Sequence, residues 1–76
     1  MTVEQLLDHF DFFPDKIVYF DEPNNTQDTV YVMRITANGE KEYDDDRYNN
    51  FVDEYGKREI EDWHYRGFNV LDLELR

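Results

Sequence analysis

The first ten residues carry apolar side chains at a helical period. The stripe consists of Val3, Leu6, Leu7 and Phe10. Thr2 and Gln5 occupy the two positions of a capping box, which predicts that a helix begins at Val3. Pro14 disfavours helical geometry in the residue before it, so we expect this helix to end near Phe12 or Phe13.

The same period returns between Tyr43 and Gly56 and predicts a second amphipathic helix. Its buried stripe would consist of Tyr48, Phe51, Val52 and Tyr55. Asp44 is suited to the N-cap, and Asp45 and Asp46 then fall in the first turn, where the helix dipole favours negative charge. Gly56 would supply a left-handed stop.

Segments rich in β-branched and aromatic residues predict strands before and after the second helix. IVYF, residues 17–20, is a short one, and TVYVMRITA, residues 29–37, is the longest. The longest segment is apolar on both alternating sets, which predicts a central strand covered on both faces. FNVLDLEL, residues 68–75, has leucines at every second position on one face.

Two further signals set the pairing. Asn38-Gly39 is typical of a type I′ hairpin turn, which predicts a return strand over residues 40–43 with Ile35 opposite Glu42. Residues 59–65, EIEDWHY, break strict alternation and predict a β-bulge near Glu61 and Asp62. The order is therefore αβββαββ, in a single domain spanning residues 1–76.

The predicted fold class is α+β, with two short helices packed on a mainly antiparallel sheet of four or five strands. Short connections between neighbouring strands favour antiparallel pairing. The predicted core consists of Leu6, Leu7, Phe10, Ile17, Tyr19, Val30, Val32, Met33, Ile35, Phe51, Val52, Ile60, Leu71 and Leu73.

Charge changes this picture of an ordinary small domain. The chain has 19 acids against 8 lysines and arginines, a net charge of −11. Such a field repels nucleic acid and anionic membranes and attracts basic partners. The acids run through both halves of the chain among apolar residues, so we expect a folded acidic surface rather than a tail. The opening residues resemble neither a signal peptide nor a membrane span, and we expect a cytoplasmic protein.

The candidate catalytic and metal-binding patterns all fail. His9 and His64 lack a second ligand at metal-binding spacing, the chain has no cysteine, and the three glycines form no phosphate-binding loop. An EF-hand counted from Asp44 would place Tyr48 and Tyr55 at ligand positions. We therefore expect no enzyme, no cofactor and no metal site.

Acids are densest in residues 40–62, which hold ten acids against four bases. Carboxylates that project from an edge strand, a helix and the strand after it can imitate the phosphates of a duplex. The predicted partner-binding residues are Glu40, Glu42, Asp44, Asp45, Asp46, Asp53, Glu54, Glu59, Glu61 and Asp62.

Two features carry a resemblance to known proteins. The opening helix that runs into F-P-D and IVYF, and the segment from Tyr55 to Ile60 followed by Trp63, resemble short acidic proteins encoded by phages and prophages of Gram-positive bacteria. The αβββα order with an N-G hairpin and an acidic helix is also similar to small anti-CRISPR proteins. The resemblance implies a phage accessory protein, of the kind that blocks a CRISPR nuclease at the site where it reads the protospacer-adjacent motif.

These observations predict an acidic protein-binding module. The preferred hypothesis is an inhibitor that mimics nucleic acid and occupies a basic groove on a nucleic-acid-binding protein of the bacterial host. The alternative is a small adaptor or homodimer whose interface consists of exposed aromatic residues, with the acidity serving solubility. Trp63, Tyr65 and Tyr31 would form that interface.

Overall fold

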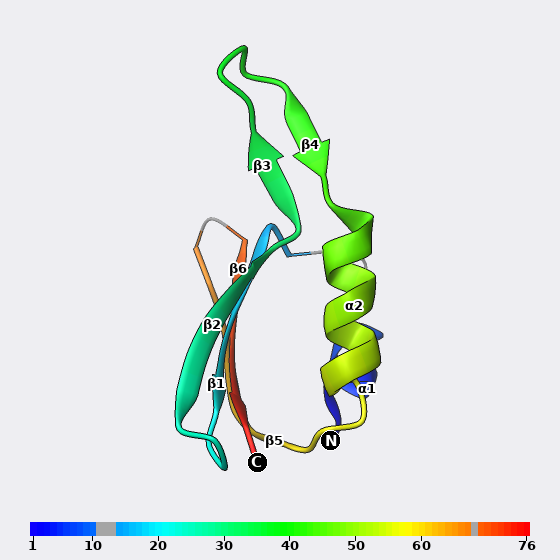
Figure 1. Cartoon of the computed structure of the whole chain (residues 1–76), viewed down its shortest axis with the longest axis vertical. Coiled ribbons are helices and arrows are strands. Elements are labelled where there is room, and N and C mark those ends of the chain that lie inside the picture. Colours follow the sequence, from blue (N-terminus) through cyan, green and yellow to red (C-terminus); the bar gives the residue numbers. More distant parts are fainter. Residues whose placement is uncertain (11–13, 68) are drawn as a thin grey trace.

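The amphipathic segments assemble into helices on one side of a mixed sheet (Figure 1). The computed structural model describes residues 1–10, 14–67 and 69–76. Its elements are α1 (Val3–Leu7), β1 (Lys16–Asp21), β2 (Thr26–Tyr31), β3 (Met33–Ile35), β4 (Lys41–Tyr43), α2 (Asp45–Tyr55), β5 (Ile60–Arg66) and β6 (Val70–Leu75). The predicted α+β class is confirmed, with one more strand than the predicted order has.

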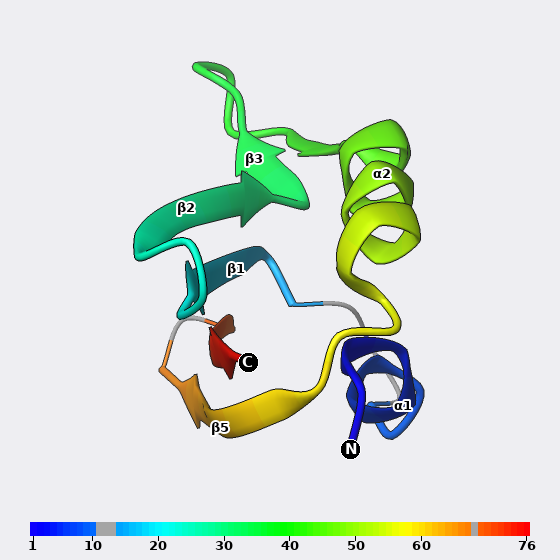
Figure 2. The ribbon, with the colours of Figure 1, turned by 60° about the horizontal axis from the view of Figure 1, so that its bottom comes forward.

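The main sheet has the order β2-β1-β6-β5, and β3 and β4 form a separate two-stranded hairpin. The β1–β2 and β5–β6 pairs are antiparallel, whereas the central β1–β6 pair is parallel. A parallel pair needs a long crossover, and here the crossover contains β2, the hairpin, α2 and β5. Figure 2 shows both helices on the concave side of the curved sheet, so the opposite face is uncovered.

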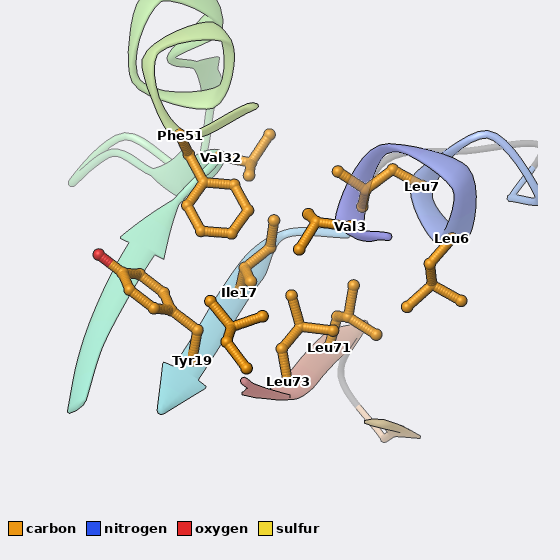
Figure 3. Close-up of a cluster of buried hydrophobic side chains, with 10 residues drawn as sticks. Val3, Leu6, Leu7, Ile17, Tyr19, Val32, Phe51, Leu71 and Leu73 are labelled. Atoms are coloured by element: carbon orange, nitrogen blue, oxygen red, sulfur yellow. The ribbon is translucent and has the colours of Figure 1, made fainter. Parts of the chain in front are cut away.

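The core lies between that concave face and the two helices. Alternate residues of β1 and β6 point inward, and the register places Ile17 beside Leu71 and Tyr19 beside Leu73. In Figure 3, Phe51 of α2 points into this cluster opposite Tyr19. The buried hydrophobic residues are Val3, Leu6, Leu7, Ile17, Tyr19, Val32, Phe51, Val70, Leu71, Leu73 and Leu75. Of the other predicted core residues, Phe10, Val30, Val52 and Ile60 pack against this cluster while partly exposed.

Helix α1 begins as predicted and ends earlier. The Thr2 side chain accepts the Gln5 N–H at 3.3 Å, and the Gln5 side chain accepts the Thr2 N–H at 3.0 Å, which completes the capping box. The helix ends at Leu7, not near Phe12 or Phe13, because the amides of His9 and Phe10 bond to carbonyls three positions back and tighten the last turn. Residues 11–13 lie outside the described residues.

Helix α2 has the predicted start and buried stripe. The Asp44 side chain accepts the Arg47 N–H at 3.0 Å, so Asp44 is the N-cap. The prediction for Gly56 is wrong, since its φ of −56° is right-handed. A β-carbon at Gly56 would lie 2.3 Å from the Val52 carbonyl oxygen and 3.2 Å from Glu4 Oε2, and the Gly56 carbonyl accepts the Glu4 N–H at 2.9 Å. The glycine is therefore required by the close approach of the Val52 carbonyl in the last turn of α2, and it also leaves room for the Glu4 side chain of α1.

The predicted central strand over residues 29–37 is wrong. Residues 26–31 form β2 at the edge of the main sheet, and residues 33–35 form β3 in the hairpin. The chain bends at Val32, which is 2% exposed. The amides of Val32 and Met33 both donate to the Asp15 carbonyl, and the Val32 carbonyl accepts the Asp44 N–H. These bonds direct the chain out of the sheet, so residues beyond Val32 leave the core.

The hairpin turn and its register also differ from the prediction. A type I′ turn needs positive φ at Asn38 and Gly39, but only Gly39 has it, at 80°. The Thr36 N–H bonds to the Glu40 carbonyl across a three-residue loop. The longer loop shifts the pairing by one residue, so that Ile35 faces Lys41 and is 67% exposed instead of buried. The predicted bulge is confirmed, as the β5 register shifts between Ile60 and Asp62.

Phe51→Ala should lower the free energy of unfolding by about 3–5 kcal/mol, because it removes the ring that packs α2 against the sheet. Ile35→Ala is the matched control, and we expect a change within about 0.5 kcal/mol because that side chain is exposed. Urea denaturation followed by circular dichroism measures both. Equal losses for the two variants would contradict the packing described above.

Candidate partner-binding site

The arginines of this chain are already engaged inside the molecule. Arg47 Nε lies 3.3 Å from Asp44 Oδ2, and Arg66 Nε lies 2.6 Å from Asp72 Oδ2. Arg76 pairs with Glu61, and Arg58 pairs with Asp21. The remaining arginine, Arg34, lies over the Tyr31 ring at 5.4 Å. Basic groups thus neutralise acids locally, and the surplus negative charge is left on the other carboxylates.

The Arg58–Asp21 pair ties three parts of the chain together. Arg58 Nη2 lies 2.8 Å from Asp21 Oδ1, and Arg58 also donates to the Arg76 main-chain oxygen through Nε at 2.9 Å. Asn24 donates to the other carboxylate oxygen of Asp21 at 2.9 Å. These hydrogen bonds, led by that from Arg58, lower the pKa of the Asp21 carboxyl, which is 2% exposed.

The ten predicted acids separate into two groups. The first belongs to the hairpin and α2. It consists of Glu40, Glu42, Asp44, Asp45, Asp46, Asp53 and Glu54. Figure 1 shows β4 leading directly into α2 along the long axis of the molecule, which extends 40 Å. Within this group Asp44 serves as the helix cap and pairs with Arg47, so it is not free for a partner.

The second group lies on β5 and just before it, and its members already have partners. The Glu59 carboxylate lies 3.0 Å from the Met1 amino group, and Glu61 pairs with Arg76. Asp62 accepts the Trp63 N–H at 2.9 Å. The β5 strand lies at the sheet edge away from β2, and Figure 2 shows it well apart from α2. The sequence-predicted set does not therefore form a single surface.

Five exposed acids of the first group lie along the segment that runs from the hairpin into α2, and we call them the acidic strip. The strip consists of Glu40, Glu42, Asp45, Asp46 and Asp53. All are exposed, and among the described residues none of them has an ion-pair partner. From the rises of strand and helix the strip is about 25 Å long, somewhat less than the ~34 Å turn of a DNA duplex. Asp46 and Asp53 lie two helical turns apart on the outer side of α2.

The hairpin beside this strip exposes apolar side chains. Ile35 and Tyr43 are 67% and 62% exposed and point to the same face as Met33, because alternate residues share a face. Residues 33–43 carry two acids and two bases, so the hairpin is neutral in a strongly acidic chain. Exposed apolar side chains on a neutral arm are typical of a protein contact.

The aromatic residues named for the alternative interface do not come together. Trp63 lies on β5 with its ring 5.9 Å from that of Phe10, and Tyr65 packs on the same Phe10 ring at 5.1 Å. Tyr31 lies at the end of β2, at the opposite edge of the sheet, with Lys16 and Arg34 over its ring. Trp63 and Tyr65 therefore lie together around Phe10, and Tyr31 does not join them in one contact surface.

A groove that sequence reasoning missed lies between α2 and β2. Its volume is about 230 Å³. The lining residues are Tyr19, Asp28, Thr29, Val30, Arg47, Asn50, Phe51, Glu54 and Tyr55. Asn50 and Glu54 stand next to Phe51 and Tyr55 on α2, and this pattern could have pointed to a groove along that side of the helix. The other wall could not be predicted, because the sequence did not indicate that β2 is an edge strand.

Metal binding and membrane crossing can be examined in the described part of the chain. Within residues 1–10, 14–67 and 69–76, no group of three or more histidine, aspartate or glutamate side chains is placed to hold a metal ion. In the same part of the chain neither helix is long and apolar enough to cross a membrane. Comparisons with protein-family models, curated proteins and solved structures return no match for this chain.

The Asp21–Arg58 pair predicts a pH dependence of stability. Because the pKa of Asp21 is lowered in the folded chain, its contribution is present above the ordinary aspartate pKa of about 3.9 and is lost as pH falls through the lower folded value. Asp21→Asn should lower the urea midpoint at pH 7, and the difference from the wild type should shrink towards pH 3. A difference that stays constant across that range would contradict the assignment.

Proposed function

We propose that this chain is an acidic protein-binding module that mimics nucleic acid and occupies a basic nucleic-acid-binding groove on another protein. The acidic strip carries the proposal. Its carboxylates are exposed, and among the described residues none of them has an ion-pair partner, although Arg47 pairs with Asp44 in the same segment and Arg34 lies opposite Glu42. A groove that binds a duplex presents lysines and arginines spaced for phosphates, and a line of carboxylates of similar length meets the same groups.

The strip is less densely charged than one strand of DNA. Its five charges over about 25 Å have a mean spacing of ~6 Å, with the widest gap of about 10 Å between Asp46 and Asp53, against the ~3.4 Å repeat of phosphates along one strand. Residues 40–55 carry seven acids and two bases. One of those bases, Arg47, is paired with Asp44, and the other, Lys41, points away from Glu42 because neighbours on a strand face opposite ways.

The sequence resemblance suggests which protein to test first. Small acidic phage proteins, including anti-CRISPR proteins, act on nucleic-acid enzymes of the bacterial cell. A CRISPR nuclease of the host is therefore the first target to examine, and this proposal implies a cytoplasmic site of action. The alternative of an adaptor or homodimer through Trp63, Tyr65 and Tyr31 is less well supported, because Tyr31 lies at the opposite edge of the sheet from Trp63 and Tyr65.

The strip can be tested with two variants of equal charge. Glu42→Gln/Asp46→Asn/Asp53→Asn removes three charges from the strip, and Glu22→Gln/Asp62→Asn/Glu74→Gln removes three charges elsewhere. The immobilised chain is incubated with host extract. Retained proteins are then eluted with a short DNA duplex of about one turn and, in parallel, with salt of equal ionic strength. We expect the duplex to elute a basic nucleic-acid-binding protein that the strip variant no longer retains.

The control variant should retain that protein about as well as the wild type. If both variants lose it equally, bulk charge rather than the strip accounts for retention. If salt elutes the retained protein and the duplex does not, the hypothesis that this chain mimics nucleic acid is wrong.

The exposed hairpin residues predict a separate kinetic effect. Ile35→Ser/Tyr43→Ser should raise the dissociation rate of the retained protein by about tenfold or more, because buried apolar anchors act mainly on dissociation. The strip variant should instead lower the association rate and its salt dependence. Surface plasmon resonance separates the two. Unchanged dissociation in the hairpin variant would show that the hairpin is not part of the interface.

A further inference from the structure

The α2–β2 groove has an aromatic floor. The rings of Tyr19, Phe51 and Tyr55 pack against one another with centroids 4.9–5.4 Å apart. Figure 3 shows Tyr19 of β1 and Phe51 of α2 facing each other, with the Tyr19 hydroxyl at the outer end of its ring. Each ring face carries partial negative charge, so such a floor attracts cations as well as apolar groups.

A carboxylate lines the groove on each side. Asp28 comes from β2 and Glu54 from α2, and both line the groove and are exposed. Burial raises the pKa of the Tyr19 hydroxyl, and a side-chain hydrogen bond with Tyr55 raises it further, followed by the negative charges of Tyr55, Asp28 and Glu54. Both carboxylates line the groove and add negative charge near its aromatic floor.

The groove also contains one basic side chain, which does not cancel this field. Arg47 lines the groove, but its Nε lies 3.3 Å from Asp44 Oδ2, so its charge is partly neutralised. Arg58, which is not among the lining residues, already lies over the Tyr55 ring at 5.9 Å. Tyr19 and Phe51 are 7% and 4% exposed, so Tyr55, which is half-buried, is the ring of the cluster with most surface left for a ligand in the groove.

We propose that the α2–β2 groove binds a cationic side chain, arginine in preference to lysine, presented by the basic partner. The planar guanidinium stacks on aromatic rings while donating hydrogen bonds to carboxylates at its edge, and an ammonium lacks the stacking surface. Asp28 and Glu54 supply the carboxylates, and the volume of about 230 Å³ admits one long side chain. The assignment of this arginine to a nucleic-acid-binding protein rests on the proposed function. The proposal that the groove binds a cationic side chain does not depend on it.

The test uses N-acetyl-arginine-amide as the probe and the neutral isostere N-acetyl-citrulline-amide as its control. Both are titrated into the ¹⁵N-labelled chain and followed by amide chemical shifts. We expect saturable shifts at Thr29, Asn50 and Tyr55 with the arginine probe, with a Kd on the order of 10 mM. Citrulline should produce no saturable shift at these residues, and N-acetyl-lysine-amide should bind more weakly than arginine.

Two variants with equal charge locate the site. Asp28→Asn/Glu54→Gln should weaken arginine binding by about tenfold or more, whereas Asp62→Asn/Glu74→Gln, on the opposite face of the sheet, should stay within about twofold. Equal weakening in both variants, or equal shifts with citrulline, would overturn the proposal. So would the absence of any saturable shift at the groove residues.

The outcome is separable from that of the proposed function. If the arginine probe binds in the groove but a duplex fails to displace the retained protein, the groove stands and the nucleic-acid mimic does not. If the duplex displaces the protein but the probe does not bind, the strip accounts for recognition and the groove proposal fails.

Discussion

The contact between Phe51 and Tyr19 is the interaction on which the functional surfaces depend. Phe51 is the buried residue of α2, and its ring centroid lies 5.0 Å from that of Tyr19 on β1. This contact holds α2 over the concave face of the sheet. It thereby sets the direction of the acidic strip, forms the floor of the α2–β2 groove and, through Asp44 and Val32, fixes the base of the hairpin.

Local signals in the sequence predicted local structure well. The caps at Thr2 and Asp44, the α2 stripe and the β5 bulge are confirmed because each depends on residues close together in the chain. Longer-range choices failed. Residues 29–37 are apolar on both alternating sets, Val30 and Val32 on one and Met33 and Ile35 on the other, as in a central strand, yet a domain of this size buries too little surface to cover both faces of such a strand. Bonds from Val32 and Met33 to the Asp15 carbonyl decided where the strand breaks, and no sequence pattern announces them.

In the candidate site, too, local features were predictable from the sequence and long-range pairings were not. Composition predicted an acidic surface, and position on α2 predicted that Asp53 is exposed. The sequence could not tell that Glu59 and Glu61, which look equally free, are bound to the Met1 amino group and to Arg76. Those pairs depend on the antiparallel closure of the sheet, which brings chain ends together. Among the carboxylates of the strip, Glu42 is the register partner of Arg34 on β3, so a carboxylate without an ion pair can still lie opposite a basic group.

Carbodiimide cross-linking of the chain to the protein it retains tests the central claim most directly, because the reagent joins carboxylates to lysines that touch them. Peptide mass spectrometry then identifies the joined residues. The account predicts cross-links from Glu42, Asp46 and Asp53 to lysines in the partner's nucleic-acid-binding groove. Cross-links that arise from Asp62 and Glu74 on the opposite face, or that join the strip to lysines outside that groove, would contradict it.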